Sequence, residues 1–249
     1  MISTDLREQI GTHGFAVLAE FYTLDELAPA VAEVSALDGP PGPRCQSGVY
    51  AVRNLLQLAP SVRALAASGK IRALVEEVLG NPAFPVRALL FDKTAAANWL
   101  VPWHQDLSIC VKSRLPFPGF GSWSTKSGIV HVQPPAHILE HMLAVRIHLD
   151  PTDETNGALR VLPGSHNQGR LSAGQIAALQ PGARAVTCCV PRGGVVLMKP
   201  LLLHASSAGT RPVHRRVIHI EFAAVDLPGG LQWHFLDRRG GPKPEAAKT

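Results

Sequence analysis

Three side chains in this sequence carry donor atoms that together could hold a transition metal: His104, Asp106 and His204. Two imidazoles and one carboxylate make up the facial triad, which binds Fe(II) on one face of an octahedron and leaves the other positions open. Alternate residues of a strand face the same side, so we expect His104 and Asp106 to point together with Gln105 turned aside. His204 follows the apolar run 201–203, which we interpret as part of a neighbouring strand.

A His-x-Asp pair is weak evidence by itself, because a chain with 11 histidines offers several such pairs by chance. Support comes from Arg215, which follows His204 and stands at the head of the apolar stretch 217–222. A guanidinium pairs with a carboxylate through two parallel hydrogen bonds. Arg215 and Arg216 alternate along the predicted strand, so we expect one to point into the protein and the other toward solvent.

The composition is that of a globular protein with a sizeable core, since 46% of the 249 residues are hydrophobic and 17% are charged. The net charge of +5 is scattered, without a basic run interleaved with aromatic residues, so nucleic acid is not an expected partner. No apolar stretch approaches the roughly 18 residues of a membrane span. The first residues lack a signal-peptide core, and the four cysteines form neither a zinc motif nor a disulfide framework. We therefore expect a cytoplasmic protein that acts on a small molecule, with its oligomeric state open.

The order of the elements predicts a mainly β fold with flanking helices. A capping box from Thr23 to Glu26 begins a helix that runs to about residue 37, and the stretch 56–79 has the apolar spacing of two helices. Short apolar runs between turns indicate strands at 15–18, 86–92, 144–150, 157–162, 185–190, 194–199 and 216–222. This pattern is typical of a jelly roll, the cupin-like double-stranded β-helix, with N-terminal helices packed on one side.

We interpret the chain as a single domain. Its predicted parts are a helical region at 1–84, a jelly-roll core at 85–225, a lid insertion at 107–142 and a flexible tail at 238–249. The lid is long and rich in aromatic residues, which favours an ordered functional segment. Its apolar side chains suggest that the substrate has an organic body; they are Leu115, Phe117, Phe120 and Trp123.

Several motifs occur in the order and spacing of a known family. They are Phe91-Asp-Lys93, Trp103-His-Gln-Asp106, Asn156-Gly157, Pro163-Gly-Ser-His166 and His204 followed by Arg215-Arg216. The opening Gly14-Phe-Ala-Val-Leu18 before a capped helix is also similar. On these residues the chain resembles the phytanoyl-CoA dioxygenase family of Fe(II)/2-oxoglutarate-dependent oxygenases, over nearly its whole length.

The resemblance implies a role for each matching residue. His104, Asp106 and His204 would be the iron ligands, and Arg215 would anchor the distal carboxylate of 2-oxoglutarate. Lys93 stands where some members carry a lysine near the cosubstrate. Related iron halogenases replace the carboxylate ligand by a small residue, and this chain keeps Asp106, so the resemblance favours hydroxylation or a related oxidation over halogenation.

A further pair of polar residues lies on the predicted strand 144–150. Arg146 and His148 share one face of this strand, and the apolar Val145, Ile147 and Leu149 share the other. If the apolar face packs on the helices, Arg146 and His148 look into the barrel and can reach cosubstrate or substrate. The alternative is that they are solvated on an open face.

The function that the resemblance implies is the hydroxylation of a small organic molecule, coupled to the conversion of 2-oxoglutarate and O2 to succinate and CO2. Two alternatives stay open. The same cofactors could drive desaturation, cyclisation or epimerisation in secondary metabolism. A non-catalytic jelly roll could instead bind a metal or a small molecule without any turnover.

Overall fold

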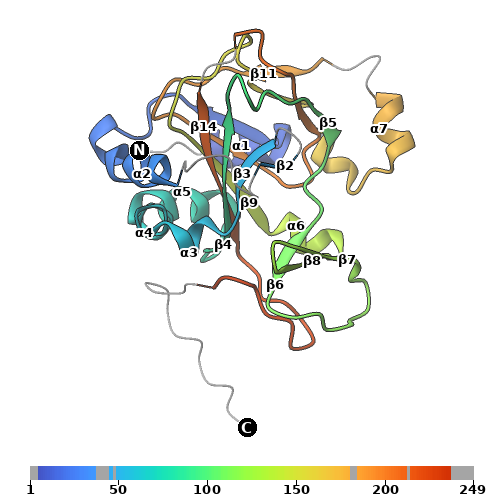
Figure 1. Cartoon of the computed structure of the whole chain (residues 1–249). Helices are drawn as coiled ribbons and strands as arrows, with labels where there is room; N and C mark the ends of the chain where they lie inside the picture. Colours follow the sequence, from blue (N-terminus) through green and yellow to red (C-terminus); the bar gives the residue numbers. More distant parts are fainter. Residues whose placement is uncertain (1–4, 38–44, 47–48, 180–183, 212–213, 237–249) are drawn as a thin grey trace.

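The computed structural model describes residues 5–37, 45–46, 49–179, 184–211 and 214–236. Figure 1 shows helices gathered on one side of a large sheet, with a smaller group of strands below. The predicted tail at 238–249 lies outside the described residues. The helices are α1 Asp5–His13, α2 Leu24–Ala36, α3 Leu55–Leu58, α4 Pro60–Ala67, α5 Gly69–Leu79, α6 Ala136–Glu140, α7 Ala173–Leu179 and the 3-10 turn η1 Ser165–Gln168.

Within the described residues the strands form three antiparallel sheets. The seven-stranded sheet contains, in spatial order, β1 Phe15–Leu18, β12 Val195–Met198, β9 Met142–His148, β14 Arg215–Ala223, β4 Phe84–Lys93, β3 Val49–Val52 and β2 Cys45–Gln46. The four-stranded sheet contains β11 Val186–Cys188, β10 Leu159–Val161, β13 His204–Ser206 and β5 Val101–His104. The three-stranded sheet contains β6 Ile109–Val111, β8 Ile129–Gln133 and β7 Gly121–Lys126.

The helices cover one face of the seven-stranded sheet, as predicted. Ile218 and Ile220 of β14 point toward them and join the largest hydrophobic cluster together with helical residues such as Leu27 and Leu74. The opposite face of this sheet looks toward the four-stranded sheet, and the two share a smaller cluster that includes Val196 and Val161. Helices outside and two facing antiparallel sheets inside confirm the predicted jelly-roll class.

Local sequence explains how the first helices begin. Thr23 Oγ1 accepts a hydrogen bond from the Glu26 amide at 3.2 Å, and the Glu26 carboxylate accepts one from the Thr23 amide at 2.7 Å. This is the predicted capping box, and α2 buries Leu27, Ala30 and Val34 along one stripe. Each fully buried leucine or valine of such a stripe contributes roughly 1.5–3 kcal/mol to stability.

The structure corrects the prediction of two helices over 56–79, because three helices cover this stretch. Pro60 stands in the first turn of α4, where its missing amide costs nothing, and it separates α3 from α4. Ser68 is extended, with φ −63° and ψ 143°, and its side chain caps α5. The chain is therefore interrupted twice, at Ala59 before Pro60 and at Ser68 before Gly69.

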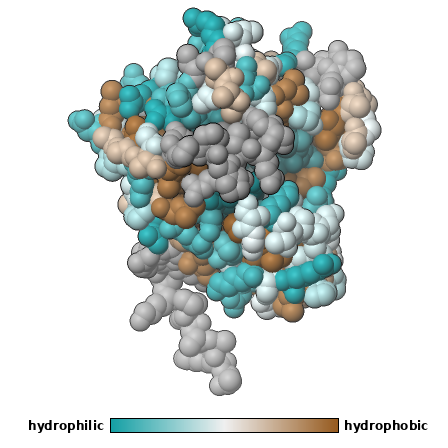
Figure 2. Space-filling view, in the orientation of Figure 1, coloured by the Kyte–Doolittle hydropathy of each residue, from teal (hydrophilic) through white to brown (hydrophobic). Residues whose placement is uncertain are grey.

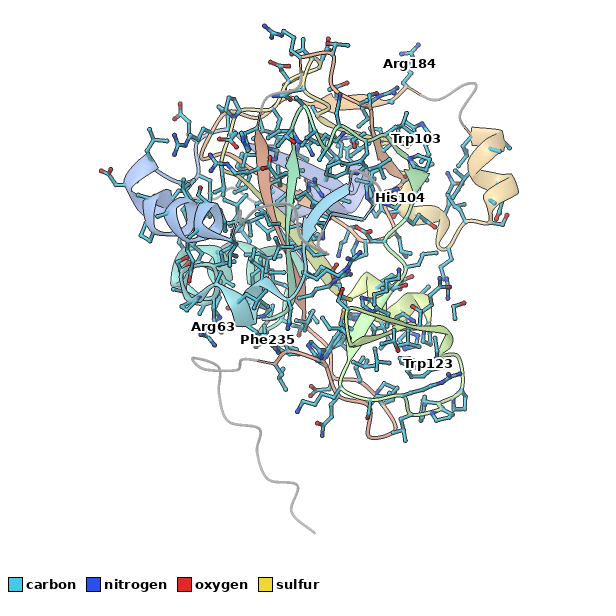
Figure 3. The ribbon with its side chains drawn as sticks, viewed as in Figure 1. Arg63, Trp103, His104, Trp123, Arg184 and Phe235 are labelled. Carbon is cyan, nitrogen blue, oxygen red and sulfur yellow. The ribbon has the colours of Figure 1, made fainter. Side chains whose placement is uncertain are left out.

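The insertion at 107–142 is ordered, and its aromatic side chains pack with one another instead of covering His104. Its strands form the three-stranded sheet, and Phe117, Phe120 and Trp123 pack with the later Leu231 and Trp233 in a hydrophobic cluster of their own. In Figure 3, Trp123 lies well below His104. The aromatic residues are thus explained by local packing.

Hydrophobic residues on the face seen in Figure 2 occur in separate groups among hydrophilic ones. Within the part of the chain that the structure describes, no helix has the length and apolar character needed to cross a membrane.

Candidate metal centre

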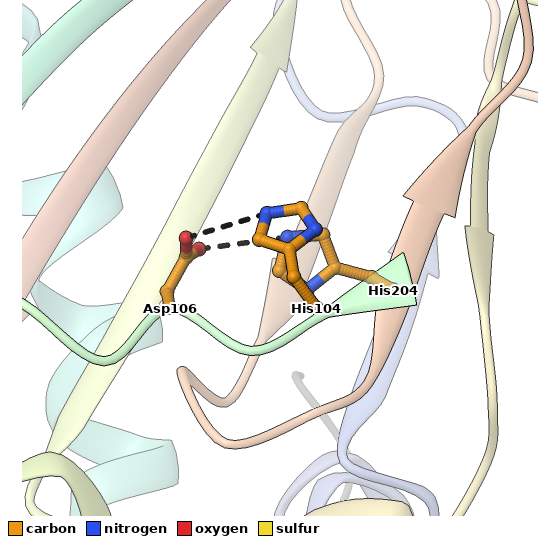
Figure 4. A group of neighbouring side chains, drawn as sticks. All are labelled: His104, Asp106 and His204. Carbon is orange, nitrogen blue, oxygen red and sulfur yellow. Dashed lines mark ion pairs between the residues drawn. The ribbon is translucent and has the colours of Figure 1, made fainter. Parts of the chain in front are cut away.

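The three predicted ligands meet at one point between β5 and β13. These strands pair with His104 opposite His204, which sets the two imidazole rings 4.2 Å apart between centroids. Asp106 lies two residues beyond His104, where β5 has ended, with its carboxylate oxygens 3.9 Å from His104 Nε2 and 3.7 Å from His204 Nε2. Figure 4 shows this convergence. One donor atom from each side chain falls within 4.8 Å of the others, so the three can hold one metal ion.

One feature of the sequence analysis is wrong here, because the apolar run 201–203 is a turn and not a strand. His204 is the first residue of β13 and carries the ring inward from the end of that turn. The turn is short because Leu202 N donates to Lys199 O at 3.0 Å. The apolar side chains 201–203 are buried in the core, which explains their run in the sequence.

Backbone carbonyls orient both imidazoles. Nδ1 of His104 lies 2.8 Å from Pro102 O, and Nδ1 of His204 lies 2.9 Å from Leu202 O. A carbonyl accepts only, so each Nδ1 carries the proton and each Nε2 presents its lone pair toward Asp106. A metal-binding histidine requires this tautomer, and such outer hydrogen bonds fix the ring direction.

Gln105 is turned aside, as the alternation predicted, and it pins the segment that carries the triad. Its side-chain amide donates to Gly169 O at 2.8 Å and to Leu201 O at 2.7 Å. Its carbonyl oxygen accepts from the Leu171 amide at 2.8 Å. Because Gln105 is buried, these bonds tie the neighbours of both histidines to one side chain.

The electrostatics of the group suit a metal ligand set. Withdrawal from water opposes ionisation of Asp106, but the adjacent His204, His219 and His104 outweigh it and lower its pKa to about 2. Burial is the main cause that lowers the pKa of His204 to about 4. At neutral pH Asp106 is therefore an anion and His204 is neutral, which are the states that bind a metal cation.

A pocket opens beside the triad, between the two facing sheets. Its empty space, counted together with the open solvent at its mouth, is about 650 Å³. The wall opposite the triad comes from β4, β9 and β14. It carries an unusual number of charged side chains; the lining includes Arg87, Lys93, Arg146, Arg215, His219 and Glu221.

Arg215 and Arg216 point to opposite sides of β14, as the alternation predicted. Arg215 is 3% exposed, lines the pocket and donates from Nη1 to Gly157 O. Arg216 binds Asp150 on the other face through Nε and Nη2, both at 2.8 Å. Arg215 is thus the arginine that can meet a ligand in the pocket.

Lys93 lies directly opposite Arg215 in the β4–β14 pairing and is only 2% exposed. Its ammonium donates to Ser206 Oγ at 3.0 Å and to Ser207 O, and it lies 5.5 Å from the centre of the Trp99 ring. Burial, followed by the charges of Arg215 and Arg146, lowers the pKa of Lys93 to about 7. Two neighbouring cations without a carboxylate between them favour an anionic ligand.

Arg146 and His148 point inward, which decides between the two arrangements considered for this strand. Arg146 is 7% exposed, and its guanidinium lies 3.2 Å from His219 Nδ1 and 5.7 Å from the centre of the Phe91 ring. Arg146 lines the pocket, whereas His148 is fully buried behind it near Thr152. Arg146 therefore remains a candidate for ligand contact and His148 does not.

Sequence reasoning missed Arg87 and Glu221, which lie in the same pocket. Arg87 Nη1 donates to Glu221 Oε1 at 3.0 Å, and His219 Nε2 lies 3.5 Å from the same oxygen. The signal was present, since Arg215, His219 and Glu221 occupy one face of β14 by alternation. The charged residues stood in apolar strands, and their sequence positions alone did not show that this face is interior.

Comparison with known protein families identifies the family of this chain. The sequence profile described as "Phytanoyl-CoA dioxygenase (PhyH)" matches residues 12–217, which is most of the chain. The chain belongs to the phytanoyl-CoA dioxygenase family. It is therefore a member of an enzyme family of non-haem iron, 2-oxoglutarate-dependent oxygenases, and the resemblance seen in its motifs is confirmed. A comparison with curated protein sequences gives no significant match.

Solved structures share the fold at low sequence identity. AviO1 from Streptomyces viridochromogenes Tue57 is 22% identical, with a TM-score of 0.65 over 90% of this chain and 96% of that one. The carbocyclase SnoK from nogalamycin biosynthesis is 15% identical, with a TM-score of 0.70 over 96% and 89%. EctD from S. alaskensis, solved with 2-oxoglutarate and 5-hydroxyectoine, is 18% identical, with a TM-score of 0.68 over 90% and 77%.

The residues present fit the cofactors of the phytanoyl-CoA dioxygenase family. The donor set of the triad is two nitrogens and one carboxylate, which suits Fe(II). Across the pocket, Nε of Arg215 and Nε of Arg146 are buried without a hydrogen-bond partner among the described residues. Buried polar groups in native proteins are normally satisfied, so unpaired guanidinium nitrogens beside a cavity indicate a ligand that accepts hydrogen bonds.

Proposed function

We propose that this protein is a Fe(II)/2-oxoglutarate-dependent dioxygenase that hydroxylates a small organic molecule and releases succinate and CO2. His104, Asp106 and His204 hold the iron. The observation that carries this proposal is the meeting of the three donor atoms within 4.8 Å in a pocket whose opposite wall is cationic. Family membership supports the same reaction class.

In this proposal 2-oxoglutarate binds to the cationic wall of the pocket. Arg215 and Lys93 bind the distal carboxylate of 2-oxoglutarate, because they are adjacent, buried and free of an acidic partner that lines the pocket. Arg146 lines the same pocket beside His219 and contacts the proximal part of the diacid. A planar guanidinium and an ammonium together give the carboxylate both direction and charge.

Iron bound at the triad supplies the activation of O2 at the positions that the three side chains leave open. The protein supplies placement. The Nδ1 bonds of His104 and His204 hold both imidazoles in the metal-binding tautomer. Asp106 occupies the carboxylate position and stays ionised at neutral pH. A pocket between two sheets limits the access of water to the reacting groups.

A second reaction type has specific support. Among the solved structures that share this fold are an epimerase, SnoN, and a carbocyclase, SnoK, both described as non-haem α-ketoglutarate-dependent. Cyclisation or epimerisation by the same cofactors is therefore the alternative to hydroxylation. The structure of the product distinguishes them, because hydroxylation adds one oxygen atom to the substrate and the other two reactions do not.

The test of the proposal is succinate release from 2-oxoglutarate under air with added Fe(II). We expect His104→Ala, Asp106→Ala and His204→Ala each to abolish it, while the control His137→Ala, which changes an exposed histidine, leaves it intact. Full succinate release by any triad variant would contradict the ligand assignment. Metal binding by the wild type without any succinate release would support a non-catalytic jelly roll.

A further inference from the structure

The pocket extends well beyond the cosubstrate residues. Arg215 and Glu221 stand six residues apart on β14, and a strand rises about 3.3 Å per residue, so their backbones lie roughly 20 Å apart. 2-Oxoglutarate has five carbons joined by bonds of about 1.5 Å and spans roughly 6 Å at most. Side chains of a strand stand roughly perpendicular to the sheet, so a molecule anchored on Arg215 ends short of Glu221, which lines the same pocket.

Glu221 is held as a fixed acceptor at this far end. Its Oε1 receives the Arg87 guanidinium at 3.0 Å and lies 3.5 Å from His219 Nε2. His219 in turn lies 3.2 Å from Arg146, so the side chain is braced from two directions. A carboxylate offers about four acceptor sites, and these contacts use one oxygen. The side chain keeps 8% of its surface exposed, toward the pocket that it lines.

We propose that Glu221 recognises the substrate, and that the substrate is an uncharged organic molecule bearing a hydroxyl group that donates to this carboxylate. The inference rests on the proposed function, because it assigns the anchor end of the pocket to 2-oxoglutarate. An ionised carboxylate accepts hydrogen bonds and cannot donate them, so its partner carries an O–H or N–H group.

The charge of the pocket selects the hydroxyl over an ammonium. Four lining side chains are basic, namely Arg87, Lys93, Arg146 and Arg215, and two are acidic, namely Asp106 and Glu221. The charges of Fe(II) and of the 2-oxoglutarate dianion cancel, so the lining decides the balance, and Arg87 already neutralises Glu221. A second cation next to Arg87 would meet repulsion in a poorly hydrated site. A neutral hydroxyl forms the hydrogen bond without that cost.

The apolar part of the lining fits such a molecule. Leu89 and Phe91 lie between Arg87 and Lys93 on the same face of β4, and all four side chains line the pocket. A carbon skeleton can pack on these side chains while one hydroxyl reaches Glu221. Pockets that combine an apolar wall with a few fixed polar groups take their specificity from those groups.

The competing explanation is that Arg87 and Glu221 only join β4 to β14 as a buried ion pair. The two interpretations differ in selectivity. A purely structural pair changes stability when altered and has no effect on which molecules bind. A substrate acceptor discriminates molecules with a hydroxyl from those without one, because the unmatched carboxylate is left desolvated.

The experiment measures binding of a matched probe set to the protein loaded anaerobically with Fe(II) and 2-oxoglutarate. The probes are cyclohexane-1,2-diol, cyclohexanol, cyclohexylamine and cyclohexanecarboxylate, each titrated by ligand-observed NMR. We expect the two hydroxylated probes to bind more tightly than the amine and the acid. Glu221→Gln should weaken the diol about tenfold, and the exposed control Glu8→Gln should not change it.

A second variant covers the case in which Glu221→Gln fails to fold because Arg87 is left unpaired. Arg87→Met combined with Glu221→Gln removes both charges and should lose the preference for the diol in the same way. The inference is overturned if the diol does not bind, if the amine binds as tightly, or if both variants bind the diol like the wild type. Failure of the wild type to bind 2-oxoglutarate with Fe(II) would instead refute the proposed function.

Discussion

Replacing Arg215 by alanine removes the guanidinium that we assign to the distal carboxylate of 2-oxoglutarate. The Arg215 side chain is 3% exposed, so after its removal bulk water has little access to the carboxylate that it would bind. Truncating one partner of a buried, hydrogen-bonded charge pair costs about 2–5 kcal/mol, which corresponds to a loss of affinity of roughly 30-fold to several thousand-fold. Lys93 remains next to the carboxylate and keeps part of the attraction, so we expect a loss of about 100-fold.

Arg216→Ala is the matched control, because it removes the same chemical group from the next residue. Arg216 lies on the other face of β14 and binds Asp150 through two hydrogen bonds. Its loss should lower the free energy of unfolding by about 1–3 kcal/mol and change 2-oxoglutarate affinity by less than about threefold.

The assay is equilibrium titration of each variant with 2-oxoglutarate under anaerobic conditions with Fe(II) present, accompanied by urea unfolding of the same samples. Equal weakening by Arg215→Ala and Arg216→Ala would refute the reasoning, since it would mean that the effect reaches the pocket through the fold. A weak effect of Arg215→Ala alone would show that another group anchors the diacid.

Three further outcomes follow from the contacts. The pKa of Lys93 falls from 10.5 to about 7 on folding, so the unfolded chain binds more protons between these values and the unfolding free energy should rise with pH there, by up to about 1.4 kcal/mol per unit. Thermal melts of the metal-free protein should lose this slope in Lys93→Met, and a slope of undiminished size would contradict the assignment. Gln105→Leu removes three buried hydrogen bonds and should cost about 2–4 kcal/mol in urea unfolding while weakening Fe(II) binding; unchanged metal affinity would show that the clamp does not position the triad. Gly157→Ala places a Cβ 2.5 Å from Ser207 O at a residue with φ +77°. Gly128→Ala is the matched control, because its φ is +76° and the added Cβ meets no atom within 4 Å. Only Gly157→Ala should therefore weaken 2-oxoglutarate binding in the anaerobic titration with Fe(II). Equal behaviour of the two glycine variants would remove the steric argument.

Much of the site was predictable because its chemistry depends on residue type and alternation. The side-chain types of His104, Asp106 and His204 already identify them as possible metal ligands, and the structure brings them together. The opposite directions of Arg215 and Arg216 follow from the period of a strand. The inward direction of Arg146 needed the structure, since alternation alone allowed either face to be buried.

Other features could not be read from the sequence because they depend on contacts between distant segments. The apolar run before His204 has the composition of a buried strand, yet its side chains fill the core from a turn. The aromatic residues of the insertion pack on Trp233 near the other end of the chain, a contact that no spacing within 107–142 predicts. The pairing of Glu221 with Arg87 joins two strands 134 residues apart, and no sequence pattern indicates it.

The most direct test of the central claim is an anaerobic titration of the metal-free protein with Fe(II) and then 2-oxoglutarate, followed by visible absorption. Chelation of a 2-oxo acid to iron held by the triad gives a charge-transfer band. We predict that the band appears in the wild type, with one 2-oxoglutarate and one iron per chain, and is absent in Asp106→Ala. A wild-type protein that binds iron and shows no band on addition of 2-oxoglutarate would contradict the proposed function.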